Sequence, residues 1–164
     1  MPSATNSKKH EAEVKYQYHD LSEDQFEKLT IAICKEILGI GAQGFASGKD
    51  VGRDARFYGK AQNYPSQSDL WNGLIIIQAK HTNGFNEKFS EPDFFGNQSS
   101  VIKKETPKIK KLYTEKALDY YMLFSNRKLT ADSHHKISDF IADKTGLEKR
   151  KIGLFPISWG RHNI

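Results

Sequence analysis

Hydrophobic residues recur at helical spacing in one early segment of the chain, residues 21–41. The repeating positions are Phe26, Leu29, Ile33 and Ile37. Their intervals of three, four and four residues are typical of the apolar face of an amphipathic α-helix, and Thr30, Cys34 and Leu38 extend the same arc. Ser22 and Gln25 have the spacing of a capping box at the start of that helix, and Gly39 is a natural stop. The pattern therefore predicts a helix that packs one side against a core.

Short apolar runs predict strands elsewhere in the chain. The expected strands are approximately residues 53–60, 70–82, 117–126 and 151–159. The run "LIII" in the second of them indicates a strand that is covered on both faces. The polar segment 61–69 is expected to be a long loop that joins the first two strands into a hairpin. Pro156 favours an edge position for the last strand, because proline cannot donate a ladder hydrogen bond.

Two more helices complete the predicted order of elements. Residues 97–116 have helical composition, with an expected interruption at Pro107, and residues 131–146 form a helix that ends at Gly146. The order α-β-β-α-β-α-β predicts an α/β fold in which a mixed sheet is flanked by helices. Residues 1–18 are polar and lack periodicity, so we expect a flexible arm followed by a single domain over residues 19–164.

Composition and charge narrow the class of protein. The 164 residues suit one core, and no apolar run approaches the ~20 residues of a membrane-spanning helix. The first twenty residues lack the apolar stretch of a secretory signal, and a single cysteine, Cys34, excludes an internal disulfide. We therefore expect a cytoplasmic protein without a membrane partner. The net charge of +5 is compatible with a polyanionic partner.

Polar residues with catalytic potential stand at the end of the strongest strand. Gln78 and Lys80 end the run "LIIIQAK" and, being two residues apart, share one face of the strand. The glycine-rich segment "GKDVGRDARF" places Asp54 at the start of the preceding strand. Pairing of the two strands would bring Asp54, Gln78 and Lys80 to one edge of the sheet.

Glu27 is an acid on the flank of the apolar face of the first helix. Two interpretations are open from periodicity alone. Glu27 either lies at the rim and reaches solvent, or it approaches the sheet edge and faces a cation, a hydrogen-bond donor or an open cleft. Carboxylate and amide oxygens are hard ligands that suit Mg²⁺, and a lysine beside a metal-bound water can orient it or stabilise a phosphorane charge. An acid, an amide and a lysine thus suffice for metal-assisted hydrolysis of a phosphodiester.

The order of these residues resembles the PD-(D/E)xK nuclease motif, in the glutamine variant found in Mrr-like restriction endonucleases. The matching elements are the pair Phe26–Glu27 in the first helix, "GRD" at Gly52–Asp54 after a glycine-rich turn, and an apolar strand that ends in "QAK" at Gln78–Lys80. The resemblance covers approximately residues 21–145. Arg53 departs from it, because a small or aliphatic residue is common at that position.

The resemblance implies a restriction-endonuclease-like core and a role for each matching residue. Asp54 would be the principal metal ligand, Gln78 the second ligand, Glu27 the helix acid that completes the metal site, and Lys80 the catalytic lysine. The implied cofactor is Mg²⁺, for which Mn²⁺ can substitute. The implied reaction is cleavage of double-stranded DNA with low sequence specificity.

Basic residues supply candidate contacts to the DNA backbone. Those expected to bind nucleic acid are Arg53, Arg56, Lys103, Lys104 and Lys108. The lysine-rich stretch is equally well explained as the solvated face of a helix, so both interpretations stay open. Mrr-like domains often serve as effectors in restriction or anti-phage defence, so we also expect a homo-oligomer that is fused to, or partnered with, a sensor or NTPase module. The alternative functions are an inactive nucleic-acid-binding module and a protein-interaction domain.

Overall fold

The computed structural model describes residues 18–42, 54–84 and 86–157. Within these ranges the chain forms three α-helices and a four-stranded sheet. The helices are α1 (Glu23–Ile37), α2 (Val101–Thr114) and α3 (Ala131–Thr145). The strands are β1 (Asp54–Ser66), β2 (Asp69–Lys80), β3 (Tyr120–Ser125) and β4 (Ile152–Pro156). Short helical turns are η1 (Tyr18–Asp20), η2 (Pro92–Gly96) and η3 (Lys149–Lys151).

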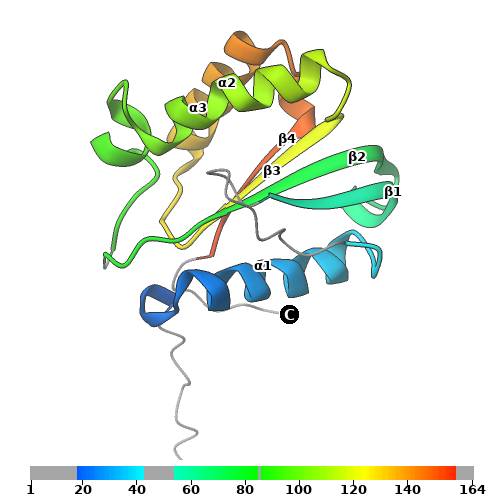
Figure 1. Cartoon of the computed structure of the whole chain (residues 1–164), viewed down its shortest axis with the longest axis horizontal. Helices are drawn as coiled ribbons and strands as arrows, with labels where there is room; N and C mark the ends of the chain where they lie inside the picture. Colours follow the sequence, from blue (N-terminus) through cyan, green and yellow to red (C-terminus); the bar gives the residue numbers. More distant parts are fainter. Residues whose placement is uncertain (1–17, 43–53, 85, 158–164) are drawn as a thin grey trace, which may run out of the picture.

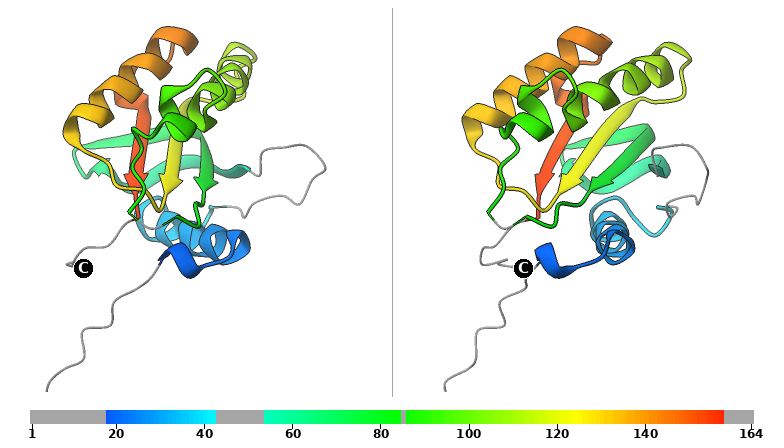
Figure 2. Two further views of the ribbon diagram at one scale, coloured as in Figure 1. Left: turned by 90° about the vertical axis from the view of Figure 1, so that its left-hand side faces the viewer. Right: turned by 60° about the vertical axis from the view of Figure 1, so that its left-hand side comes forward.

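The strands lie in the order β1-β2-β3-β4, with β1 antiparallel to β2 and the other neighbours parallel. Helix α1 covers one face of this sheet, and α2 and α3 cover the other (Figure 1 and Figure 2). The predicted α/β class, the order of elements and the mixed sheet are confirmed. Among the described strands, β4 lies at one edge of the sheet, as Pro156 indicated. A proline is tolerated there because it has no backbone N–H to donate to a further strand.

Helix α1 begins and ends as its sequence predicts. Ser22 and Gln25 form a reciprocal capping box, and Gly39 follows the helix with a positive φ of 124°. The fully buried stripe is one side of the predicted apolar arc. It consists of Phe26, Thr30, Cys34 and Leu38. The predicted positions Leu29, Ile33 and Ile37 are only half-buried, because the helix rolls so that Cys34 points at the sheet.

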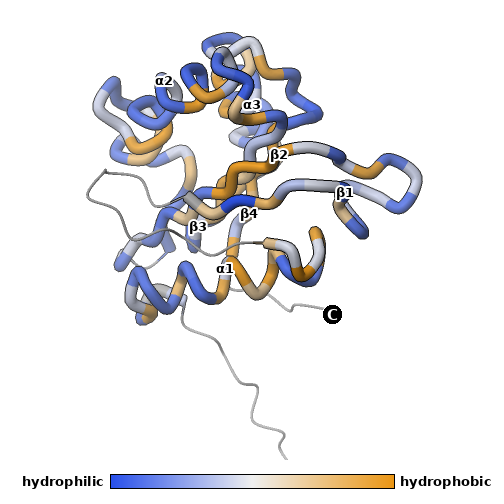
Figure 3. Tube along the Cα trace, turned by 45° about the vertical axis from the view of Figure 1, so that its right-hand side comes forward, coloured by the Kyte–Doolittle hydropathy of each residue, from blue (hydrophilic) through white to orange (hydrophobic). Residues whose placement is uncertain are grey.

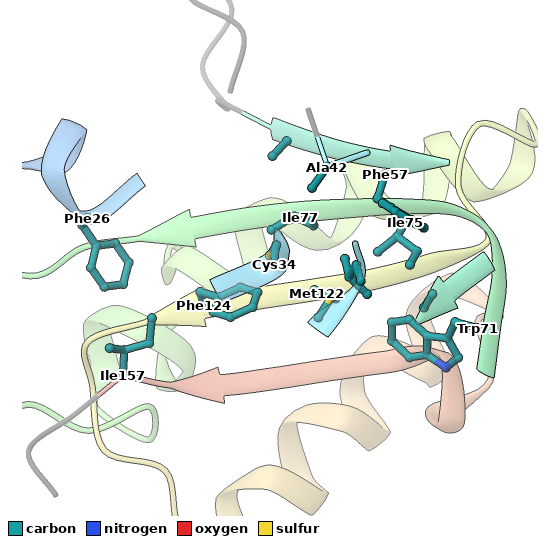
Figure 4. Packing of buried hydrophobic residues seen from close by; sticks show 13 residues of the cluster. Phe26, Cys34, Ala42, Phe57, Trp71, Ile75, Ile77, Met122, Phe124 and Ile157 are labelled. Atoms are coloured by element: carbon teal, nitrogen blue, oxygen red, sulfur yellow. The ribbon is translucent and has the colours of Figure 1, made fainter. Parts of the chain in front are cut away.

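Two hydrophobic clusters hold the layers together. The cluster between α1 and the sheet includes Phe26 and Cys34 of the helix and, on the facing side of the strands, Ile75, Ile77 and Phe124 (Figure 4). The cluster on the other face joins the sheet to α2 and α3 and includes Ile76, Ile102, Ile109, Tyr121 and Ile137. A hydrophobic stretch accordingly runs along β2, whereas the helices alternate between hydrophilic and hydrophobic positions (Figure 3). Burial also raises the pKa of the Cys34 thiol to about 12, which suits a core residue.

The predicted loop over residues 61–69 is wrong. Strand β1 continues to Ser66 and β2 begins at Asp69, so that only two residues separate the strands. Polar side chains do not prevent this, because the ladder uses backbone groups and an exposed hairpin arm leaves the side chains in water. Aromatic contacts support the arm, since the rings of Tyr64 and Trp71 meet edge to face at 4.6 Å.

The predicted interruption of the second helix at Pro107 is also wrong. Helix α2 runs through Pro107 without a break. The proline removes one backbone hydrogen bond and is exposed, while its neighbours Thr106 and Ile109 are buried. The packing of the buried side of α2 outweighs that local loss.

Candidate functional site

Strands β1 and β2 pair in the register that the candidate site requires. Asp54 is the direct backbone partner of Gln78, at the end of the ladder. The predicted approach of the two strands is thereby confirmed at the level of the backbone. The side chain of Asp54 and the whole of Arg53 lie outside the part of the chain that the structure describes.

Gln78 and Lys80 project from the same face of β2, and both contact one acid on α2. The Gln78 amide donates from Nε2 to Glu105 Oε2 at 2.9 Å. The Lys80 ammonium group donates to Glu105 Oε1 at 2.8 Å. The two predicted side chains thus bind the same carboxylate, which belongs to α2, the helix that packs on this face of the sheet.

Glu105 lies on the buried side of α2, between Ile102 and Ile109. Its side chain is only 8% exposed, and both carboxylate oxygens accept hydrogen bonds. Lys108, one turn further along the helix, approaches Glu105 Oε1 at 3.5 Å. A buried carboxylate needs such partners, because removing an ion from water without compensation costs several kilocalories per mole.

The environment of Glu105 favours its ionised form. Burial alone would raise its pKa, but the hydrogen bond and charge of Lys80, the hydrogen bond from Gln78 and the charge of Lys108 outweigh burial. The pKa of Glu105 is therefore lowered from its ordinary value of 4.5. The site holds a carboxylate anion at neutral pH.

Tyr121 on β3 fixes the orientation of the Gln78 amide. The Tyr121 hydroxyl donates to Gln78 Oε1, and Gln78 Nε2 donates to Glu105. The reverse orientation would set the amide oxygen against the carboxylate, so the two neighbours together select one rotamer. Tyr121 and Gln78 are 1% and 3% exposed, and Lys80 is 25% exposed. The network therefore runs from the core of the domain to its surface.

Glu27 is half-buried on α1, and α1 packs on the face of the sheet opposite to α2. Glu27 and Glu105 thus lie on helices that cover opposite faces of the sheet. The preceding residue, Phe26, packs its ring 5.3 Å from that of His81, just beyond the end of β2. This contact places the start of α1 near the strand end, and the role of Glu27 in a metal site stays a prediction.

The predicted nucleic-acid contacts have different surroundings. Arg56 is exposed on β1, on the face opposite to α1, because its neighbours Ala55 and Phe57 are buried against that helix. Lys104 is exposed on α2. Lys103 is half-buried, and its ammonium group lies 5.4 Å from the ring centres of both Phe95 and Phe140. Lys103 thus contributes to the contact of α2 with η2 and α3.

Lys108 differs from the other lysines of α2 because it adjoins the network. Its ammonium group lies near Glu105, and its side chain is 45% exposed. Lys80 and Lys108 thus share one oxygen of the same carboxylate. Within these three side chains the formal charge is +1, so a phosphate group would meet a net positive environment here.

Sequence reasoning missed Glu105 and Tyr121. A signal for Glu105 was present in the pattern, because Glu105 lies three residues after Ile102 and four before Ile109, on the apolar face of the helix. The surrounding lysines make this stretch look like a solvated basic surface, although Glu105 itself lies on the apolar face of the helix. Tyr121 gave no signal of its own, since a tyrosine in an apolar strand is ordinary core composition.

A second polar cluster anchors the segment that follows β2. Arg127 is 3% exposed and donates to Thr82 Oγ1, to the Lys88 carbonyl and to the carboxylate of Asp93. Its guanidinium group also lies 4.5 Å from the ring centre of Phe94. These contacts connect the end of β3 with the chain between β2 and α2, and so they help to position α2 over the sheet.

The donor set at the network suits a hard divalent cation. Glu105 offers a carboxylate and Gln78 an amide oxygen, and Asp54 begins the strand directly opposite. Mg²⁺ keeps several waters and is usually held by one or two carboxylates, so these three residues would be enough to hold it. Among the described residues there is no group of three or more His, Cys, Asp or Glu that is placed to bind a metal ion.

Across residues 18–42, 54–84 and 86–157, no helix has the length and apolar character needed to cross a membrane. A scan against protein-family models, a search of curated proteins and a search of solved structures each found no match to this chain. The resemblance to Mrr-like nucleases therefore depends on the motif residues and their order.

Proposed function

We propose that this chain is a metal-dependent endonuclease that hydrolyses phosphodiester bonds of double-stranded DNA, on a restriction-endonuclease-like core. The observation that carries the proposal is the convergence of Gln78, Lys80 and Glu105 at the end of β2, directly opposite Asp54 in the β1–β2 ladder. A carboxylate, an amide and a lysine at one sheet edge are the groups that this reaction requires.

Each group has a distinct task in the proposed reaction. When bound at this site, with Asp54 as its principal ligand, Mg²⁺ would supply an activated water and stabilise the charge that develops on the phosphate. Lys80, held by Glu105, would contact the scissile phosphate or the attacking water from a fixed direction. The two oxygens of Glu105 fix the positions of the Lys80 and Gln78 side chains before substrate binds. Less conformational freedom is therefore lost on binding.

Basic side chains on two elements support DNA as the substrate. Arg56 is exposed on β1 and Lys104 on α2, and Lys108 adjoins the network. Contacts from these cations to phosphates depend on charge and not on base sequence, in keeping with low intrinsic specificity. The proposed setting, by resemblance, is the cytoplasm, where the chain would act as a homo-oligomeric effector of restriction or anti-phage defence, joined to a sensor or NTPase module.

Cleavage of supercoiled plasmid tests the proposal. Parent protein, Asp54→Ala and Lys80→Ala are incubated with plasmid in Mg²⁺, Mn²⁺ or EDTA, with Lys136→Ala as a matched control on the exposed side of α3. Metal-dependent nicking that Asp54→Ala and Lys80→Ala abolish and Lys136→Ala retains is the expected result. Because effectors of this kind are gated by assembly, the same set is repeated with each protein fused to a constitutive dimer. If Lys80→Ala cut as well as the parent, the proposed mechanism would be wrong.

A specific observation favours one alternative, a nuclease-like module that binds nucleic acid without cutting it. The Gln78 amide oxygen already accepts from Tyr121, and Lys80 is already paired with Glu105. DNA binding in a mobility-shift assay, without cleavage in either metal and with or without forced dimerisation, would establish this function. The same result would exclude the endonuclease.

A further inference from the structure

Glu105 places a carboxylate next to Gln78, the motif position at which this chain has a neutral amide. The motif position at residue 78 usually carries an acid, and here it carries an amide. Glu105 Oε2 lies 2.9 Å from the nitrogen of that amide, so the two side-chain ends are direct neighbours. An acid at 105 and an amide at 78 therefore occupy adjoining space, on two different elements.

The contacts of Gln78 suit a supporting role more than that of a ligand. Its oxygen accepts from Tyr121 and its nitrogen donates to Glu105, so both ends of the amide are used. Gln78 is 3% exposed, and an amide oxygen binds Mg²⁺ less strongly than a carboxylate does. The hydrogen bond from Gln78 instead orients Glu105.

Oε1 is the oxygen of Glu105 that contacts the more exposed partners. This atom contacts Lys80 and Lys108, which are 25% and 45% exposed, whereas Oε2 contacts the buried Gln78. A carboxylate can accept at about four lone-pair positions, so these contacts do not exhaust its capacity. Glu105 therefore presents an anionic oxygen at the exposed end of the network, close to the catalytic candidate Lys80.

We infer that Glu105 supplies the acid of this site from helix α2, in place of an acid at position 78, and that Gln78 serves to hold the Glu105 carboxylate. The inference rests on the proposed function and names a metal-binding residue for it that the sequence motif does not contain. It also gives a physical reason for the glutamine, because an acid at 78 beside Glu105 would place two like charges at hydrogen-bonding distance in a buried site.

The inference predicts that the acid and the amide can exchange places. In the variant with both Gln78→Glu and Glu105→Gln, the site keeps one carboxylate, one amide and Lys80, and its total charge is unchanged. The single variants change that charge by one unit in opposite directions. A purely structural role of Glu105 makes no such prediction for metal affinity.

Binding of Mn²⁺ and Mg²⁺, measured by calorimetry on the full chain without DNA, tests the inference. We expect Glu105→Gln to weaken binding about tenfold or more and the double exchange to restore most of the parent affinity. Glu115→Gln, an exposed acid at the end of the same helix, is the matched control and should bind like the parent. Circular dichroism and thermal unfolding verify that each variant is folded.

Two results would overturn the inference. One is a folded Glu105→Gln that binds metal with the affinity of the parent. The other is a parent that binds neither ion. If Glu105→Gln does not fold, the inference is tested on the variant with both Gln78→Glu and Glu105→Gln. A folded double variant that does not bind metal would contradict it. Plasmid cleavage by the parent separates the two proposals, since cleavage together with an unchanged affinity in Glu105→Gln removes only the role of Glu105.

Discussion

Glu105 on α2 accepts a hydrogen bond from Gln78 on β2 at 2.9 Å, although the two residues are 27 positions apart in the sequence. This contact connects a helix to the end of a strand at the point where Asp54 pairs with Gln78. It gives the candidate site a buried anion that comes from a helix. The properties of the site therefore depend on how α2 packs over the sheet.

The first prediction concerns the stability of the Gln78–Glu105 pair. Gln78→Glu alone sets two carboxylates against each other in a buried position, and we expect it to lower the free energy of unfolding by about 2 to 4 kcal/mol. Adding Glu105→Gln should recover at least half of that loss, because one carboxylate then faces one amide again. Urea unfolding of the parent, both single variants and the double variant gives the coupling energy. Additive losses would show that the two side chains do not interact.

The second prediction concerns pH. The pKa of Glu105 is lowered in the folded protein, so the ionised group stabilises the fold above its unfolded value of 4.5, and this contribution is lost as the pH falls through the lower folded value. We expect the free energy of unfolding to fall below pH 4.5, and to fall less in Glu105→Gln. Asp93, whose pKa is lowered by its hydrogen bond with Arg127, is present in both proteins and should contribute equally to both. Identical pH profiles for parent and Glu105→Gln would contradict the prediction.

The third prediction concerns the exposed face of β1. Arg56 and Tyr58 project from the side opposite to α1, and Tyr58 is 81% exposed. We expect Arg56→Ala to weaken duplex binding and to reduce the salt dependence of log K by about 0.9 if one phosphate contact is lost. Tyr58→Ala should weaken binding without changing the salt slope, because the lost contact is uncharged.

Fluorescence anisotropy of a labelled duplex at several salt concentrations measures both quantities. Arg150→Ala is the control of equal charge, since Arg150 is exposed on η3, next to β4 at the opposite edge of the sheet. Equal losses in Arg56→Ala and Arg150→Ala would show that binding reflects net charge and not the β1 face.

The fourth prediction concerns Arg127. Arg127→Met keeps a long apolar stem over Phe94 but leaves Thr82 Oγ1, the Lys88 carbonyl and Asp93 without this donor. We expect a loss of about 2 to 4 kcal/mol in the free energy of unfolding and faster hydrogen exchange between β2 and α2. Lys128→Met, an exposed neighbour, should change stability by less than about 0.5 kcal/mol. A similar small change in Arg127→Met would show that the cluster does not stabilise the fold.

Features that depend on neighbours in sequence were predictable from the sequence. The capping box of Ser22 and Gln25 and the helix stop at Gly39 follow from local hydrogen bonding and backbone freedom, and both are present. The apolar run Leu74–Ile77 predicted a strand covered on both faces, because such a strand has no side that tolerates water. The pairing of Asp54 with Gln78 agrees with the predicted hairpin of these two strands, although the long loop expected between them is absent.

Tertiary packing decided the remaining features. Pro107 lies within α2 because packing of the buried side of that helix outweighs one missing backbone bond. Strand β1 extends to Ser66, where Pro65 and Ser66 pair with Leu70 and Asp69 after a shift in register. The position of Glu105 opposite Gln78 and Lys80 depends on how α2 lies over the sheet, which local patterns do not encode. The sequence by itself determined the helix caps, the buried strands and the identity of the residues at the end of β2. Only the tertiary structure decided that a carboxylate from a distant helix would join them, because burial of that charge is possible only where Lys80 and Gln78 are already in place to compensate it.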